Sequence, residues 1–135
     1  YTFEAEHVDA GDSEMTAVFT HSIPAAPVLT VPAHESEDVD PMATVVAWEP
    51  VTTDLDVNPI TIVGYQVIVE EDLDEDEFPT GFAQPAFSVY LPANTVQVTV
   101  PAEFMRPDSD YEWEVFAIEA SGNQTLSSAE FATLE

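Results

Sequence analysis

Short runs in which apolar and polar residues alternate make up most of this chain. In the clearest run, Tyr111, Trp113 and Val115 are separated by single glutamates, which is the pattern of a strand with one buried face. No segment shows the 3.6-residue period of an amphipathic helix. Glycine is scarce (4 residues) and proline is plentiful (11 residues), so turns divide the runs into short pieces. The pattern predicts an all-β fold.

Six such runs, the one just described among them, predict strands in the body of the chain. They cover residues 43–50, 62–70, 87–92, 95–101, 111–119 and 127–134. The preceding stretch, residues 23–32, contains three prolines. Proline cannot donate to a sheet ladder, so this stretch suits an edge strand. We therefore expect about seven strands in one domain, residues 24–135.

The first 23 residues predict a separate β-hairpin. Tyr1, Phe3 and Ala5 alternate with polar residues, and residues 9–13 are rich in turn-forming types. The apolar positions of the second run are Met15, Ala17 and Phe19. A lone hairpin is only marginally stable in water. We therefore expect residues 1–23 to pack on the body of the protein or on another chain.

Five motifs, in this order, resemble those of fibronectin type III domains. They occupy residues 26–28, 48–50, 64–67, 105–111 and 117–123. The first is similar to the opening of strand A, and the second to the strand-B tryptophan with its following proline. The third is similar to the strand-C tyrosine motif. The fourth is similar to the Leu-x-Pro-x-x-x-Tyr corner, with Met105 in place of leucine, and the fifth to the end of strand F.

This resemblance covers roughly residues 24–134 and implies an immunoglobulin-like β-sandwich. It implies a domain of the bacterial or archaeal secreted or surface type, with a binding or spacing role and no catalysis. Large aromatic rings would fill the space between the two sheets, and Tyr111 would form a tyrosine corner. The expected core residues are Trp48, Tyr65, Met105, Tyr111 and Trp113. The loop at residues 121–123 lacks Arg-Gly-Asp, so integrin recognition is not implied.

Charge narrows the range of partners. The chain has 27 acidic residues and one basic residue, Arg106, for a net charge of −26. Such a surface repels nucleic-acid phosphates and anionic lipid headgroups, and no apolar stretch of about 18 residues offers a membrane span. Adaptation to saline water and a generally acidic extracellular protein both explain the composition.

The resemblance also places the A–B, C–C′ and E–F loops at one pole of the sandwich. Those loops carry 14 of the 27 carboxylates: Glu35, Glu37, Asp38, Asp40, Glu70, Glu71, Asp72, Asp74, Glu75, Asp76, Glu77, Glu103, Asp108 and Asp110. Hard cations such as Ca²⁺ prefer oxygen ligands. The candidate calcium ligands are Asp72, Asp74, Asp76 and Glu77. The first three have EF-hand spacing, but the required glycine and final glutamate are absent, so a solvated acidic surface is the alternative.

Other chemistry finds little support in the sequence. It contains no Gly-x-Ser-x-Gly elbow, no glycine-rich phosphate loop and no cysteine, so we expect no catalytic residues and no cofactor besides calcium. His7, His21 and His34 are far apart in the sequence, and zinc would need further ligands. Asn123 begins an Asn-Gln-Thr sequon for N-glycosylation.

Three functions fit these observations. The first is a non-enzymatic extracellular binding or spacer module of a secreted or cell-surface protein. Because the chain opens with Tyr1 rather than methionine, we expect a processed form or part of a longer protein. The second is a self-assembling filament or surface-layer subunit that uses the N-terminal strands and calcium. The third is an accessory module of a secreted polysaccharide-degrading enzyme. The expected partners are accordingly another protein, neighbouring subunits or a carbohydrate.

Overall fold

The computed structural model describes residues 2–7, 11–16, 18–73 and 84–135. Among these residues the regular secondary structure is β-strand, joined by turns and loops, with no helix. The strands are β1 (Thr2–His7), β2 (Gly11–Thr16), β3 (Leu29–Val31), β4 (Ser36–Val39), β5 (Val45–Trp48), β6 (Ile62–Glu71), β7 (Ala86–Pro92), β8 (Gln97–Thr99), β9 (Asp110–Glu119) and β10 (Gln124–Thr133). The all-β prediction is confirmed. Among these residues there is no helix of the length and apolarity needed to cross a bilayer.

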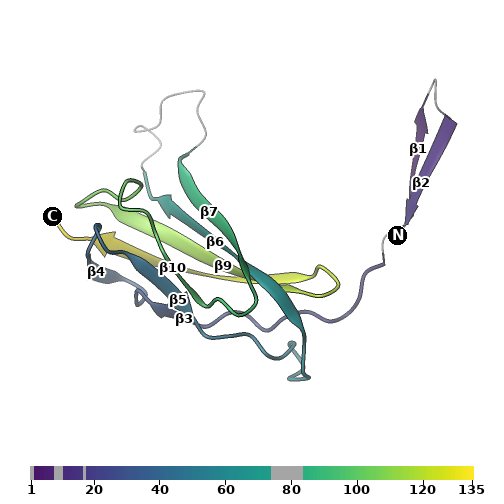
Figure 1. Cartoon of the computed structure of the whole chain (residues 1–135), viewed down its shortest axis with the longest axis horizontal. Helices are drawn as coiled ribbons and strands as arrows, with labels where there is room; N and C mark the ends of the chain where they lie inside the picture. Colours follow the sequence, from purple (N-terminus) through teal and green to yellow (C-terminus); the bar gives the residue numbers. More distant parts are fainter. Residues whose placement is uncertain (1, 8–10, 17, 74–83) are drawn as a thin grey trace.

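Two sheets face each other and form a sandwich (Figure 1). The larger sheet has the strand order β4-β10-β9-β6-β7, and the smaller has the order β3-β5-β8. The long strands β6 and β9 pair antiparallel at the centre of the larger sheet. Because the inner faces are apolar, alternate residues over much of β5, β6, β9 and β10 are buried.

One strand of the sandwich was not predicted. The edge strand expected at residues 23–32 is ordered as a strand only at β3, and the chain then crosses to the other sheet as β4, which pairs parallel with β10. Glu37 and Asp38 therefore lie on a strand, where the sequence suggested a loop. The segment Ser36–Val39 has no apolar alternation, so its backbone pairing with β10 left no sequence signal.

The core is built from the inner faces of β5, β6, β9 and β10. Trp48, Tyr65, Met105, Tyr111 and Trp113 are all buried, none more than 7% exposed. The rings of Trp48 and Tyr65 lie 5.3 Å apart between centroids and are tilted by 60°, an arrangement that favours aromatic contact.

Two buried tyrosine hydroxyls tie loops to this core. The Tyr65 hydroxyl accepts a hydrogen bond from the Val51 N–H at 2.9 Å. The Tyr111 hydroxyl accepts one from the Arg106 N–H at 2.8 Å, which is the geometry of a tyrosine corner. Each bond satisfies a backbone donor that a loop would otherwise leave unpaired.

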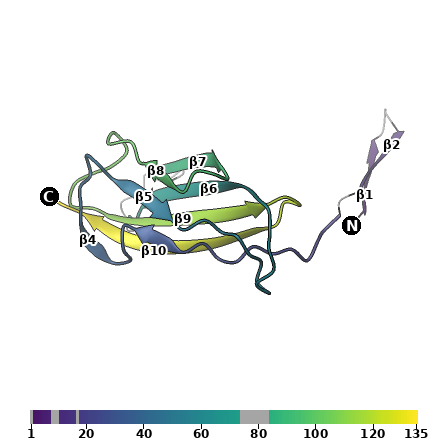
Figure 2. The same cartoon turned by 60° about the horizontal axis from the view of Figure 1, so that its bottom comes forward.

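The N-terminal hairpin differs from its prediction in the extent of its second strand. β1 and β2 pair from Thr2 opposite Thr16 to His7 opposite Gly11. The second strand thus begins inside the predicted turn at 9–13 and ends before Phe19, because backbone pairing outweighs the weak strand preference of these residues. Figures 1 and 2 both show the hairpin standing away from the sandwich. The described residues of the hairpin, 2–7 and 11–16, therefore lie apart from the body of the protein within one chain.

We expect Tyr111→Phe to lower the free energy of unfolding by about 1–2 kcal/mol, because the Arg106 N–H loses its acceptor. Urea unfolding monitored by tryptophan fluorescence measures this. Tyr90→Phe is the control. Because Tyr90 is 70% exposed, this variant should unfold with the same free energy as the unsubstituted protein. An unchanged unfolding midpoint for Tyr111→Phe would contradict the structural role of the corner.

Candidate functional site

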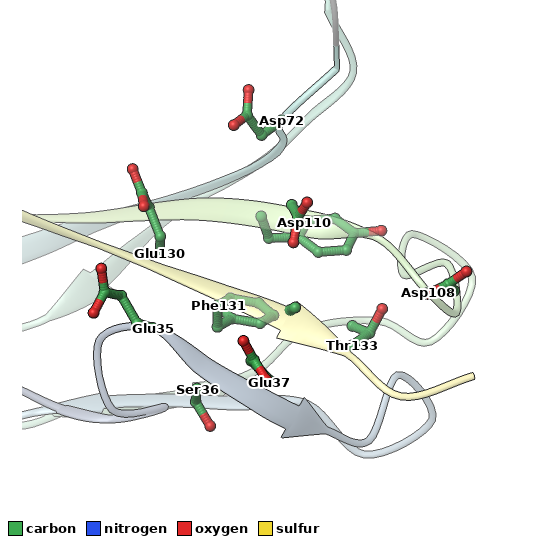
Figure 3. Close-up of a pocket in the computed structure, with 11 residues that line it drawn as sticks. Glu35, Ser36, Glu37, Asp72, Asp108, Asp110, Glu130, Phe131 and Thr133 are labelled. Carbon is green, nitrogen blue, oxygen red and sulfur yellow. The ribbon is translucent and has the colours of Figure 1, made fainter.

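An acidic groove of about 680 Å³ lies at the end of the sandwich where β9 begins and β10 ends. Its walls come from four segments of the chain that are distant in sequence. The lining residues are Glu35, Ser36, Glu37, Asp72, Asp108, Asp110, Tyr111, Glu130, Phe131, Ala132 and Thr133. Figure 3 shows Glu35 and Glu130 as neighbours toward one end and Asp108 at the other. We call this surface the acidic groove.

Backbone hydrogen bonds position the carboxylates of the acidic groove. The Glu35 N–H donates to the Glu130 carbonyl at 2.9 Å, and the Asp72 N–H donates to the Asp110 carbonyl at 2.8 Å. Glu35 and Asp108 have positive φ angles of 61° and 50°, a conformation that costs about 1–2 kcal/mol for an L-residue. The Asp108 N–H bonds to the Leu134 carbonyl at 3.0 Å, which helps to hold this conformation.

Almost nothing balances the negative charge of the acidic groove. Arg106, the only lysine or arginine of the chain, lines an adjoining groove that shares Asp72, Asp108 and Asp110 with the acidic groove. Its Nη1 lies 3.4 Å from Glu71 Oε1. The arginine is exposed, so this ion pair contributes at most about 1 kcal/mol. The potential at this pole is therefore negative and favours cations or cationic partners.

The predicted calcium ligands fall largely outside the described residues. Asp72 lines the acidic groove, while Asp74, Asp76 and Glu77 lie outside the described part of the chain. Within residues 2–7, 11–16, 18–73 and 84–135, no three histidine or acidic side chains are arranged to hold a metal ion. The calcium site stays a prediction.

The opposite pole carries exposed apolar side chains that sequence reasoning missed. Asp54 Oδ1 accepts hydrogen bonds from the N–H groups of Asp56 (2.9 Å) and Asn58 (2.8 Å) and so closes a tight loop. Leu55 and Val57 project from this loop, 63% and 77% exposed, and Val57 has a positive φ of 65°. Their signal was two apolar residues alternating with Asp54, Asp56 and Asn58.

Beside this loop, a buried carboxylate shapes the turn between β9 and β10. Glu119 accepts hydrogen bonds from the N–H groups of Ser121 (2.9 Å) and Asn123 (3.0 Å) and from the Ser121 hydroxyl. These donors hold the pKa of Glu119 below its usual value. Gly122, with a φ of 96°, supplies the left-handed position that the turn requires.

The same turn binds the segment that leads from the hairpin to the sandwich. Asn123 Nδ2 donates to the carbonyls of Thr20 (3.1 Å) and Ser22 (3.0 Å), and the Thr20 and Ser121 hydroxyls are hydrogen-bonded at 2.5 Å. We call these four residues the linker joint. Nδ2 is also the atom that would carry a glycan, so the joint and the sequon use the same atom. No local pattern connects residue 20 with residue 123, so the joint could not be predicted from the sequence.

Two glutamates of β9 should respond to pH with opposite signs. Glu119 has a lowered pKa, so its ionised form stabilises the fold above the pKa of the unfolded chain, and this contribution is lost as pH falls through the folded value. The pKa of Glu114 is raised by partial burial and then by Glu112 and Glu70, so its ionised form destabilises the fold at neutral pH.

We therefore expect Glu119→Gln to lower the unfolding midpoint at pH 7 and Glu114→Gln to raise it. The difference in unfolding midpoint between each variant and the wild-type protein should shrink toward zero at acidic pH, because the wild-type carboxyls are then protonated in both the folded and the unfolded state. Thermal unfolding of the three proteins across a pH series measures this. Equal shifts of one sign at pH 7 would contradict the two different environments.

Comparison with known proteins gives a likeness in structure alone. No family model matches the sequence, and no curated protein matches it. The third fibronectin III domain of the human KIAA0343 protein is similar, with a TM-score of 0.60, 17% identity and coverage of 93% of this chain and 94% of that one. The fn3 domain of the human collagen alpha-1(XX) chain has a TM-score of 0.52, 21% identity and coverage of 88% and 92%. A myokine structure has a TM-score of 0.52, 18% identity and coverage of 83% and 99%.

At these identities the likeness concerns the fold. It agrees with the two-sheet arrangement, the buried tryptophan and the tyrosine corner described above. The sandwich of this chain has the fibronectin type III fold, and the prediction of an immunoglobulin-like sandwich with an added N-terminal hairpin is confirmed.

Proposed function

We propose that this chain is a non-enzymatic binding and spacing module of a secreted or cell-surface protein. The observation that carries this proposal is the linker joint, in which Asn123 and Ser121 hold Thr20 and Ser22 by hydrogen bonds. A spacer must fix the direction of the segment before it, and a joint between linker and domain does so.

The path of the chain through the sandwich supports a spacing role. Figure 1 shows the linker reaching the sandwich at the end where β9 turns into β10, and the C-terminus at the opposite end. A domain that is entered at one pole and left at the other separates its neighbours by its full length. Domains of the fibronectin type III fold are generally non-catalytic modules.

Surface charge supports an exposed setting outside the cell. A net charge of −26 keeps molecules apart and soluble. The absence of cysteine removes any dependence on the redox state of the compartment. The sandwich instead relies on a buried aromatic and valine core.

The spacer proposal predicts a narrow distance distribution between hairpin and sandwich. Since the chain has no cysteine, spin labels can be placed by Thr16→Cys and Ser128→Cys and their separation measured by double electron–electron resonance. Adding Asn123→Ala should broaden the distribution, because it removes the amide donor to Thr20 and Ser22. Gln124→Ala, at the adjacent exposed position, is the matched control and should leave the distribution narrow.

A broad distribution in the labelled protein without further changes would contradict the spacing role. The unfolding midpoint of each variant is measured in parallel. A broadened distribution at an unchanged midpoint assigns the effect to the linker joint rather than to loss of the fold.

One observation favours a second candidate, a self-assembling structural subunit. The hairpin stands away from its own sandwich (Figures 1 and 2), and a lone hairpin is marginally stable in water. Strands β7, β3 and β8 are sheet edges within the described residues and offer unpaired backbone groups to a neighbour's strand.

In this second candidate, sedimentation at high salt should show large species, because screening removes the repulsion between copies. Deleting residues 1–16 should abolish them. Calcium should promote assembly more than magnesium at equal ionic strength if carboxylates between subunits bind it. A monomer under all these conditions would exclude assembly through the hairpin.

A further inference from the structure

The outer face of the larger sheet carries an ordered row of apolar side chains. Strand register places Tyr90, Gln66, Phe116 and Leu126 directly opposite one another across β7, β6, β9 and β10. Tyr90 is 70% exposed and Leu126 is 45% exposed, and Phe116 is half-buried. Phe116 and Leu126 are thus direct neighbours, and Gln66 lies between Phe116 and Tyr90, on a face turned away from the core.

Neighbouring positions extend this row into a patch. Ile118 lies two residues beyond Phe116 on the same face of β9, and Ile68 lies two residues beyond Gln66 on β6; both are half-buried. We call Tyr90, Phe116, Ile118, Leu126 and Ile68 the apolar row. Single exposed apolar residues are common on proteins, but contiguous ones mark interaction surfaces.

The other half of this face carries a row of like charges. Glu70, Glu112 and Glu130 stand directly opposite one another on β6, β9 and β10, and Glu114 lies next to them. Residues directly opposite in a sheet have Cβ atoms about 5 Å apart, and like charges there are destabilising. The raised pKa of Glu114, caused in part by Glu112 and Glu70, reflects this crowding. A cationic partner would relieve it.

A second copy of the chain is a poor occupant for this face. The protein has one basic residue, and Arg106 already lies 3.4 Å from Glu71. Two such faces in contact would bring together at least four glutamates from each copy and no compensating cation. The complementary surface must combine apolar side chains with lysine or arginine.

Strand geometry sets the spacing that such a partner needs. Phe116 and Glu112 are four residues apart on β9, which is about 13 Å along an extended strand. A helix with a rise of 1.5 Å per residue covers that distance in about nine residues. An amphipathic helix of ordinary length can therefore reach both halves of the face.

We propose that the outer face of β7, β6, β9 and β10 is a docking surface for a cationic amphipathic protein segment. The apolar side chains of the partner segment contact Tyr90, Phe116 and Leu126. Its lysine or arginine side chains contact the row of Glu70, Glu112 and Glu130. This inference rests on the binding part of the proposed function and names the chemistry of the partner.

The test is calorimetric titration with a synthetic helical peptide of leucine and lysine, about 14 residues long, long enough to cover both rows. Two pairs of substitutions remove one half of the face each: Tyr90→Ser with Leu126→Ser, and Glu112→Gln with Glu114→Gln. Each has a control pair of the same substitution types at exposed residues away from the face. The controls are Met42→Ser with Leu55→Ser, and Glu49→Gln with Glu103→Gln.

Each face pair should weaken peptide binding roughly tenfold, about 1.4 kcal/mol, and each control pair by less than about twofold. Equal losses for the face and control carboxylates would overturn the proposal, because net charge alone would then attract the peptide. No binding to the unsubstituted protein, or equal binding of a leucine–glutamate peptide, would also overturn it.

Two further readouts separate the remaining explanations. Urea unfolding of every variant shows whether a loss of binding reflects loss of the fold. Sedimentation of the unsubstituted protein, if it revealed dimers that Tyr90→Ser with Leu126→Ser abolished, would assign the face to a second copy and overturn the proposal. Since the distance measurement across the linker joint is independent, failed peptide binding with an intact joint would overturn this inference and leave the spacing role standing.

Discussion

The pairing of β6 with β9 is the interaction on which the rest of the structure depends. Both strands have ten residues, and the pairs Val67–Val115 and Val69–Trp113 place four buried side chains against the smaller sheet. Because side chains alternate strictly between the two faces of a strand, the residues that face the core determine which of their neighbours face the solvent. A shift of one residue would bury the glutamates of β9 and expose its tryptophan.

Surface chemistry follows from that constraint. Carboxylates on β6, β9 and β10 have to lie outside, and the register lines them up across the sheet beside an apolar row. The two poles then differ in kind. One gathers acidic residues from four segments around a groove, and the other exposes Leu55 and Val57 and holds the linker by Asn123. A single domain thus carries both the proposed docking face and the linker joint, while the chemistry of its two ends differs.

Sequence patterns predicted the parts of the structure that depend on local order. The alternation in residues 111–119 predicted a half-buried strand, and the motif from Met105 to Tyr111 suggested a corner in which the hydroxyl now accepts the Arg106 N–H. Prediction failed where pairing comes from distant backbone. β4 has no apolar period yet joins the larger sheet, and β2 includes residues typical of turns. The acidic pole was expected from the family resemblance, but the strand that carries Glu37 was not.

By itself, the sequence determined an all-β fold with an acidic surface, because apolar period, proline placement and net charge are local or additive properties; the sandwich was implied by the family resemblance. Only the tertiary structure decided which side chains become neighbours. It brought Thr20 to Asn123, Glu35 to the backbone of Glu130, and Glu70 into line with Glu112. These contacts join residues separated by tens of positions along the chain, and they depend on strand register and on the crossing of the chain between sheets. Both are properties of the packed core as a whole.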